Sequence, residues 1–167
     1  CADKHMCQQA VNAVGKGTTI LTRQDWASQF ANWPNVKEFP NLPYSGDKRQ
    51  DEPFHWGTGP YAGVLGLAFK PKAIFMIGFD LHPLEKDKIN NMYTGSDGYK
   101  YIKRPVDPSY WIYQFHKLMG YSDPDTRWIV VNHDRWEMPE EWKKHGNVFQ
   151  ETYDGMAQFI NKQLNKK

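Results

Sequence analysis

The chain has 167 residues, of which 40% are hydrophobic and 15% aromatic, with 21 basic and 19 acidic side chains and a net charge of +2. This composition excludes a disordered chain, and the interspersed charges argue against a nucleic-acid partner. No apolar run in the sequence approaches the ~20 residues of a membrane span, so no membrane partner is expected. Two cysteines, Cys1 and Cys7, provide neither a disulfide framework nor a metal site. We therefore expect a cytoplasmic protein with a single domain over residues 1–167.

Short elements are predicted in the first third of the chain from helix formers, β-branched residues and breakers. They are a helix over 3–12, a strand over 18–22, a brief helix over 26–30, a strand over 36–39 and a surface loop over 40–54.

The most informative segment follows that loop. The Gly-rich turn Gly57-Thr58-Gly59 opens a predicted helix over 58–69, and a wholly apolar strand over 73–79 leads to Asp80. An apolar run without alternation is typical of a strand buried on both faces, so we expect an interior strand of a parallel sheet with the helix packed on it. A carboxylate just past such a strand lies where open α/β sheets bind ligands.

Helices and strands continue to alternate through the rest of the chain. The predicted elements are a long loop over 81–108, a helix over 108–119, a strand over 127–132, a short helix over 140–145 and an amphipathic helix over 152–164. This alternation predicts an α/β fold, a Rossmann-like three-layer sandwich with a mainly parallel sheet. The loop over 81–108 is long enough to be a mobile lid over a binding site.

Asp80 and His82 are the candidate catalytic pair, at the end of the buried strand. Together they could act as a general base, a metal ligand or a ribose contact; alternatively, Asp80 caps the next turn and His82 is solvated. A metal is not expected, because a single Asp-x-His without a third ligand is common by chance. His133 and Asp134 follow the next strong strand and form a weaker second candidate on the same rim, whereas His116 is expected at the edge of the core.

Thr58 and Gly59 lie at a helix N-terminus, where free N–H groups can meet an anion. The glycines could equally serve close packing of the helix alone. Tyr93, in the long loop, could stack on a base or simply anchor the loop. Lys103 and Arg104 at the loop's end could meet phosphates or form a solvated corner.

These motifs together resemble a known group of proteins. The Thr58-Gly59 turn, the small-residue helix, the strand ending Ile77-Gly78-Phe79-Asp80 and the Tyr-bearing loop are similar to bacterial sialyltransferase-like and motility-associated glycosyltransferases and to 6-hydroxymethylpterin pyrophosphokinase-like proteins. The segment Cys1-Ala2-Asp3-Lys4 resembles the end of an earlier family strand, which makes Asp3 a further candidate for substrate binding. The resemblance implies a nucleotide or nucleotide-sugar ligand along the strand rim and no other cofactor.

The chain departs from the family pattern at two points. It lacks the N-terminal strand and Gly-Asn-Gly phosphate loop, so it is expected to be N-terminally incomplete. The family's catalytic His is replaced by Lys103-Arg104-Pro105-Val106, which argues against sialyl transfer and leaves His82 as the substitute base. The expected function is a nucleotide- or nucleotide-sugar-dependent transferase, and the alternative is a catalytically silent Rossmann-like binding or structural module.

Overall fold

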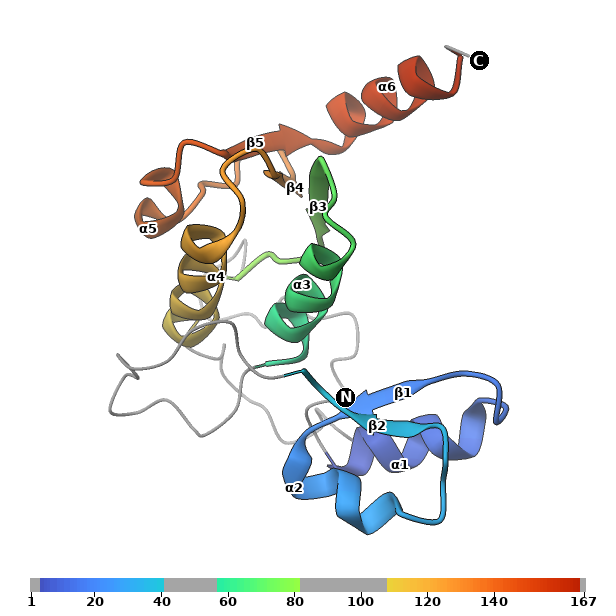
Figure 1. Ribbon diagram of the computed structural model, residues 1–167. Coiled ribbons are helices and arrows are strands. Elements are labelled where there is room, and N and C mark those ends of the chain that lie inside the picture. The colour runs from blue at the N-terminus through green and yellow to red at the C-terminus, as the bar shows by residue number, and fades with distance from the viewer. Residues whose placement is uncertain (1–3, 41–56, 82–107, 166–167) are drawn as a thin grey trace. The chain divides into compact units, whose positions relative to one another are not determined.

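The computed structural model describes residues 4–40, 57–81 and 108–165 (Figure 1). The chain divides into two compact units, residues 1–69 and residues 70–167. Each unit is described by itself.

The first unit joins short helices to a two-stranded parallel sheet. Ile20 of its first strand is opposite Val36 of its second strand. The elements, in chain order, are α1 (Lys4–Ala13), β1 (Ile20–Thr22), α2 (Gln24–Ala27), the 3-10 helix η1 (Ser28–Phe30), β2 (Val36–Glu38) and α3 (Thr58–Ala68). The helices and strands predicted for this part are confirmed within a few residues at their ends.

A small apolar core holds α1, β1 and η1 together. Cys7 and Val11 on α1 pack with Ile20 of β1 and Phe30 of η1, and all four are buried. Because the Cys7 thiol is fully buried here, it acts as a small apolar side chain in this core.

The second unit contains a three-stranded parallel sheet with the order β3-β4-β5. Its elements are β3 (Ala73–Ile77), α4 (Ser109–Tyr121), β4 (Arg127–Asn132), α5 (Glu140–Lys143), β5 (Val148–Thr152) and α6 (Tyr153–Leu164). Both strand pairs are parallel, with Ile77 opposite Val131 and Asn132 opposite Thr152. A mixed α/β structure with small parallel sheets is therefore confirmed.

The position of β3 corrects one prediction. We expected the apolar 73–79 strand to be interior, but in the sheet formed by the described residues β3 lies at an edge and β4 is central. The burial agrees, because Ile77 of β3 is 51% exposed whereas Val130 and Val131 of β4 are fully buried. An apolar run indicates which residues tend to be buried, but it does not indicate whether the strand has one neighbouring strand or two.

The strand β5 was not predicted. Its sequence, Val148–Thr152, has only two apolar residues at its start, followed by polar ones. It forms because its whole length pairs in parallel register with β4, from Trp128 opposite Val148 onward. Pairing with a strongly β-forming neighbour therefore determines this element more than its own composition does.

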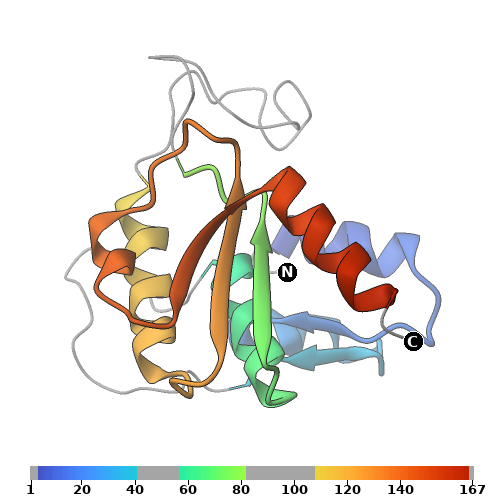
Figure 2. The ribbon, with the colours of Figure 1, turned by 90° about the horizontal axis from the view of Figure 1, so that it is seen from above.

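Aromatic side chains fill the space between the sheet and the helices α4 and α5, which lie on one side of the sheet (Figure 2). Phe115 of α4 contacts Phe79 edge-on at 5.0 Å between ring centroids and Trp142 of α5 at 5.7 Å. The buried Trp142 also donates a 2.9 Å hydrogen bond from its indole Nε1 to the main-chain oxygen of Ile112. These contacts attach α5 to α4.

Helix α6 leaves β5 on the other side of the sheet from α4 and α5 (Figure 2). Phe159 on its predicted apolar face reaches Phe75 of β3, with 5.6 Å between ring centroids. Tyr153, Phe159 and Ile160 nevertheless remain 44%, 44% and 41% exposed. The predicted helix is thus confirmed, and its apolar face is only partly covered.

Other predictions about the architecture stay predictions. One is the packing of the 58–69 helix on the 73–79 strand, which would be a contact between the two units. Another is the single domain over 1–167, which would include both units. The predicted loops over 40–54 and 81–108 fall almost wholly outside the described residues. Among the helices in the described ranges, none has both the length and the apolar character needed to cross a bilayer.

Candidate functional site

Three parallel strands of the second unit end at the same edge of their sheet. β3 ends at Ile77 and turns through Gly78, whose φ of +78° suits glycine, to reach Asp80. The next strand, β4, ends at Asn132 and is followed by His133. The register places Thr152, the last residue of β5, opposite Asn132. Polar residues from three strands therefore gather at the carboxyl edge of this sheet, where α/β proteins bind ligands.

Asp80 is held at this edge by two side chains from the β4 side. Nδ2 of Asn132 donates to Oδ1 of Asp80 at 3.4 Å, and the indole Nε1 of Trp136 donates to the main-chain oxygen of Asp80 at 2.8 Å. Asn132 is only 1% exposed, and its own Oδ1 accepts the main-chain N–H of His133 at 2.9 Å. Because that oxygen is occupied, the amide must direct its N–H group to the carboxylate.

The hydrogen bonds of His133 indicate its tautomer. Its Nδ1 accepts the main-chain N–H of Arg135 at 3.2 Å, so Nδ1 carries a lone pair and the proton of the neutral ring is on Nε2. That Nε2 is buried and has no hydrogen-bond partner within the described ranges. His133 therefore places an N–H donor, rather than a base, just after β4.

The end of β5 differs from the other two strand ends. Oγ1 of Thr152 accepts the main-chain N–H of Gly155 at 3.1 Å, and Oε1 of Glu151 accepts the N–H of Thr152 at 2.8 Å. These bonds cap the first turn of α6. The carboxylate of Glu151 thus already occupies the place that an anionic ligand would take at this helix.

The structure does not place the remaining predicted site residues relative to this edge. Thr58, which is exposed, and Gly59 begin α3 after the N-cap Gly57, and they belong to the first unit. Asp3, His82 and Tyr93 lie outside the described residues. The predicted shared site of Thr58, Gly59, Asp80 and His82 therefore stays a prediction.

Two residues that position Asp80 were missed in the sequence. Asn132 has a usable signal, because it ends a strong strand predicted to run parallel to the one before Asp80. Trp136 has no such signal, since it lies four residues beyond the strand in a stretch without periodicity. In the part of the chain that the structure describes, no group of three potential ligands is placed to hold a metal ion.

The edge combines an oriented carboxylate, a buried imidazole N–H and a strand-end amide. A carboxylate can accept a proton from a hydroxyl, and an imidazole N–H can donate a hydrogen bond to an oxygen. Comparison with protein-family models, curated proteins and solved structures finds no match to this chain.

Proposed function

We propose that the chain is a nucleotide- or nucleotide-sugar-dependent transferase of the glycosyltransferase-like kind, built on a Rossmann-like α/β sandwich. The observation that supports this proposal best is the gathering of Asp80, Asn132 and His133 at the carboxyl edge of a parallel sheet. In α/β folds that edge is the usual place for nucleotides and similar ligands.

Asp80 is the proposed catalytic residue. Its carboxylate takes the proton from the acceptor hydroxyl as the acceptor oxygen bonds to the anomeric carbon of the donor. The bond between that carbon and the nucleotide phosphate breaks, and its electron pair leaves with the phosphate oxygen. Asn132 and Trp136 act as positioning residues, because they fix the carboxylate and the main chain of Asp80.

His133 has a different proposed role. Its Nε2 proton suits a hydrogen bond to an oxygen of the donor phosphate, which gains charge as the bond breaks. His82 is the alternative base. Thr58, Gly59, Tyr93 and Asp3 are the proposed substrate contacts that the resemblance implies, and their test needs the bound ligand.

The experiment begins with thermal shifts of the full chain against a panel of nucleotides and nucleotide sugars. A ligand at 100 times its dissociation constant should add about 2.7 kcal/mol of stability. For the ligand that binds, Asp80→Asn should lower turnover by about 100-fold or more with little change in the shift. Asp125→Asn is the matched control, because Asp125 is an exposed carboxylate in the turn before β4, at the opposite end of that strand.

A silent binding or structural module is the second candidate, and one observation favours it. The N-terminus of α6, which follows β5 as phosphate-binding helices do, is capped by Glu151 and Thr152 of the chain itself. Binding without turnover in both wild type and Asp80→Asn would favour the silent binding module. No shift with any nucleotide would overturn the transferase proposal.

A further inference from the structure

Two histidines join α4 to the segment that follows α5. Nε2 of His145 lies 2.9 Å from Nδ1 of His116, and the ring centroids are 4.7 Å apart. The same Nδ1 of His116 lies 3.0 Å from the main-chain oxygen of Glu141 on α5. Both rings are half-buried. One nitrogen of His116 therefore faces two possible acceptors.

The carbonyl of Glu141 determines where the protons lie. A carbonyl oxygen can only accept, so Nδ1 of His116 must carry a proton and share it between Glu141 and His145. Nε2 of His145 must then be the acceptor, which requires that this nitrogen have no proton. His116 keeps the same bonds when it gains a second proton on Nε2, whereas His145 loses its bond as soon as it becomes a cation.

We propose that the His116–His145 pair is a pH-sensitive latch, in which protonation of His145 breaks the N–H···N hydrogen bond and releases the α5 segment from α4. The α5 segment here means residues 137–147. The latch does not depend on the proposed enzymatic activity.

The surroundings of His145 favour its neutral form. Burial is the main cause that lowers the pKa of His145, and the charge that His116 can carry lowers it further. The other charged groups on the neighbouring elements are exposed or half-exposed: Lys117 on α4, Asp123 after it, Glu140, Glu141 and Lys143 on α5, and Lys144 next to His145 itself. Gly120 of α4 provides the space, since a Cβ there would approach Cε1 of His145 to 3.2 Å.

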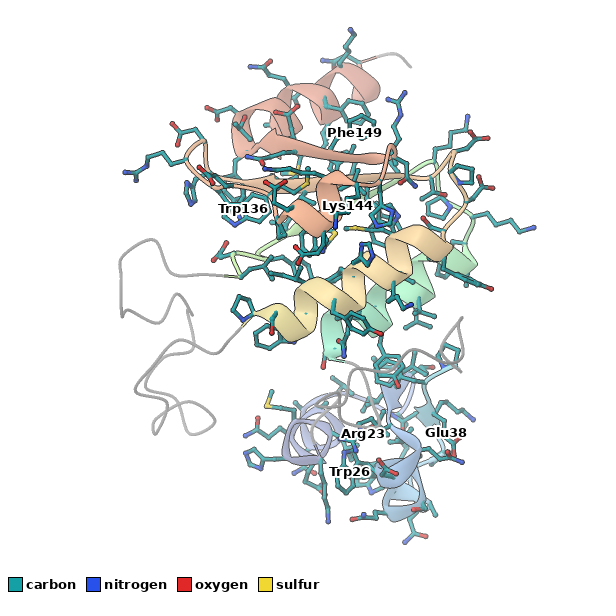
Figure 3. The ribbon with its side chains drawn as sticks, turned by 90° about the vertical axis from the view of Figure 1, so that its left-hand side faces the viewer. Arg23, Trp26, Glu38, Trp136, Lys144 and Phe149 are labelled. Atoms are coloured by element: carbon teal, nitrogen blue, oxygen red, sulfur yellow. The ribbon has the colours of Figure 1, made fainter. Side chains whose placement is uncertain are left out.

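Release of the α5 segment should also affect Trp136, which bonds to Asp80 at the carboxyl edge of the sheet. The connection between β4 and β5 carries both Trp142, which packs on α4, and Trp136, which donates to the main-chain oxygen of Asp80. Their rings lie 6.4 Å apart. Figure 3 labels Trp136 and Lys144 at the two ends of this connection. Increased mobility of the chain at His145 should therefore be transmitted to Trp136 through Trp142.

Hydrogen exchange of the full chain tests the latch. Between about pH 7.5 and about pH 5, after correction for intrinsic exchange, protection of residues 140–148 should fall about tenfold relative to the β3–β4 strands. His145→Gln should remove this pH dependence. His5→Gln, which removes an exposed histidine of α1 in the first unit, should leave it unchanged.

A second measurement needs no variant. Nitrogen-15 shifts of the imidazoles in the wild type should show His145 as the Nδ1–H tautomer at neutral pH, with a pKa below the ordinary value for histidine. The latch is wrong if neutral His145 carries its proton on Nε2, if the pKa of His145 is not below the ordinary value for histidine, or if protection of the α5 segment does not change with pH. The same conclusion follows if His145→Gln retains the full pH dependence.

Discussion

The indole of Trp136 and the backbone of Asp80 are joined by a 2.8 Å hydrogen bond across 56 positions of sequence. Trp136 is 2% exposed, so this bond is formed away from water. It links the exit of β3 to the connection between β4 and β5. The position of the candidate carboxylate thus depends on a residue outside the strands that form the edge.

Trp136→Phe should destabilise the second unit by about 1–3 kcal/mol, because the main-chain oxygen of Asp80 loses this donor in a buried place. Urea denaturation measures the change. Trp33→Phe is the control, since Trp33 lies in the first unit and its indole nitrogen donates no hydrogen bond to the described residues. Equal effects of the two substitutions would show that ring size, not the bond to Asp80, is the cause.

The lowered pKa of His145 predicts how stability changes with pH. Since its folded-state pKa lies below the ordinary value of about 6.5, the unfolded chain binds the proton first as pH falls. The contribution to the free energy of unfolding is complete above about pH 6.5 and is lost as pH falls through the folded-state pKa. Urea midpoints measured across this range should show a decline in the wild type that is smaller in His145→Gln.

Gly155 and Glu151 should show coupled effects on stability. A Cβ at Gly155 would collide with the carboxylate of Glu151, which would then have to move and give up its hydrogen bond to Thr152. Gly155→Ala normally stabilises a helix by about 0.5–1 kcal/mol. We expect that gain in the Glu151→Ala background and little or none in the wild type. A double-mutant cycle in urea measures the difference, and additive effects would contradict the contact.

The sequence could predict those features of the fold that local chemistry determines. β4 and α4 were predicted because β-branched runs and helix formers between breakers are local signals. The strand β5 and the edge position of β3 could not be predicted, because both depend on which strands pair. Pairing is a long-range property, and the sequence gives no measure of it at these positions.

The residues of the candidate site also differ in whether the local sequence carries a signal for them. Asp80 was predicted because its place after an apolar strand is a local signal. Trp136 could not be predicted, because its role rests on a hydrogen bond to a residue far away in the chain. The role of His145 was missed for the same reason, since only the approach of α4 gives it a partner in His116.

Gly63 is a buried position of α3, and its neighbour Ala62 is exposed. Gly63→Leu should therefore lower stability by about 1–3 kcal/mol or more, because the added side chain would have to displace the atoms that bury this position. Ala62→Leu adds a larger side chain one position away and should cost much less. Thermal unfolding of the two variants measures the contrast. Equal melting temperatures would mean that the Gly63 face of α3 is open to solvent.

Asn132→Asp tests the pair at the centre of the candidate site. The substitution replaces the amide that donates to Asp80 with a second carboxylate at the same place, 3.4 Å away in the wild type. Two carboxylates so close repel when both are ionised, so the variant should lose about 1.5–3 kcal/mol at neutral pH. Near pH 4 the two groups share a proton, and most of the lost stability should return.

The double variant Asp80→Asn/Asn132→Asp is the control for this result. It restores one amide and one carboxylate with their places exchanged, and the main-chain N–H of His133 still has an acceptor at residue 132. Its stability at neutral pH should therefore return most of the way to that of the wild type, with only a weak dependence on pH. Recovery in the double variant would establish that Asn132 and Asp80 are in contact in solution. If Asn132→Asp instead is as stable as the wild type at neutral pH, the two side chains do not face each other, and Asn132 is not what orients the carboxylate.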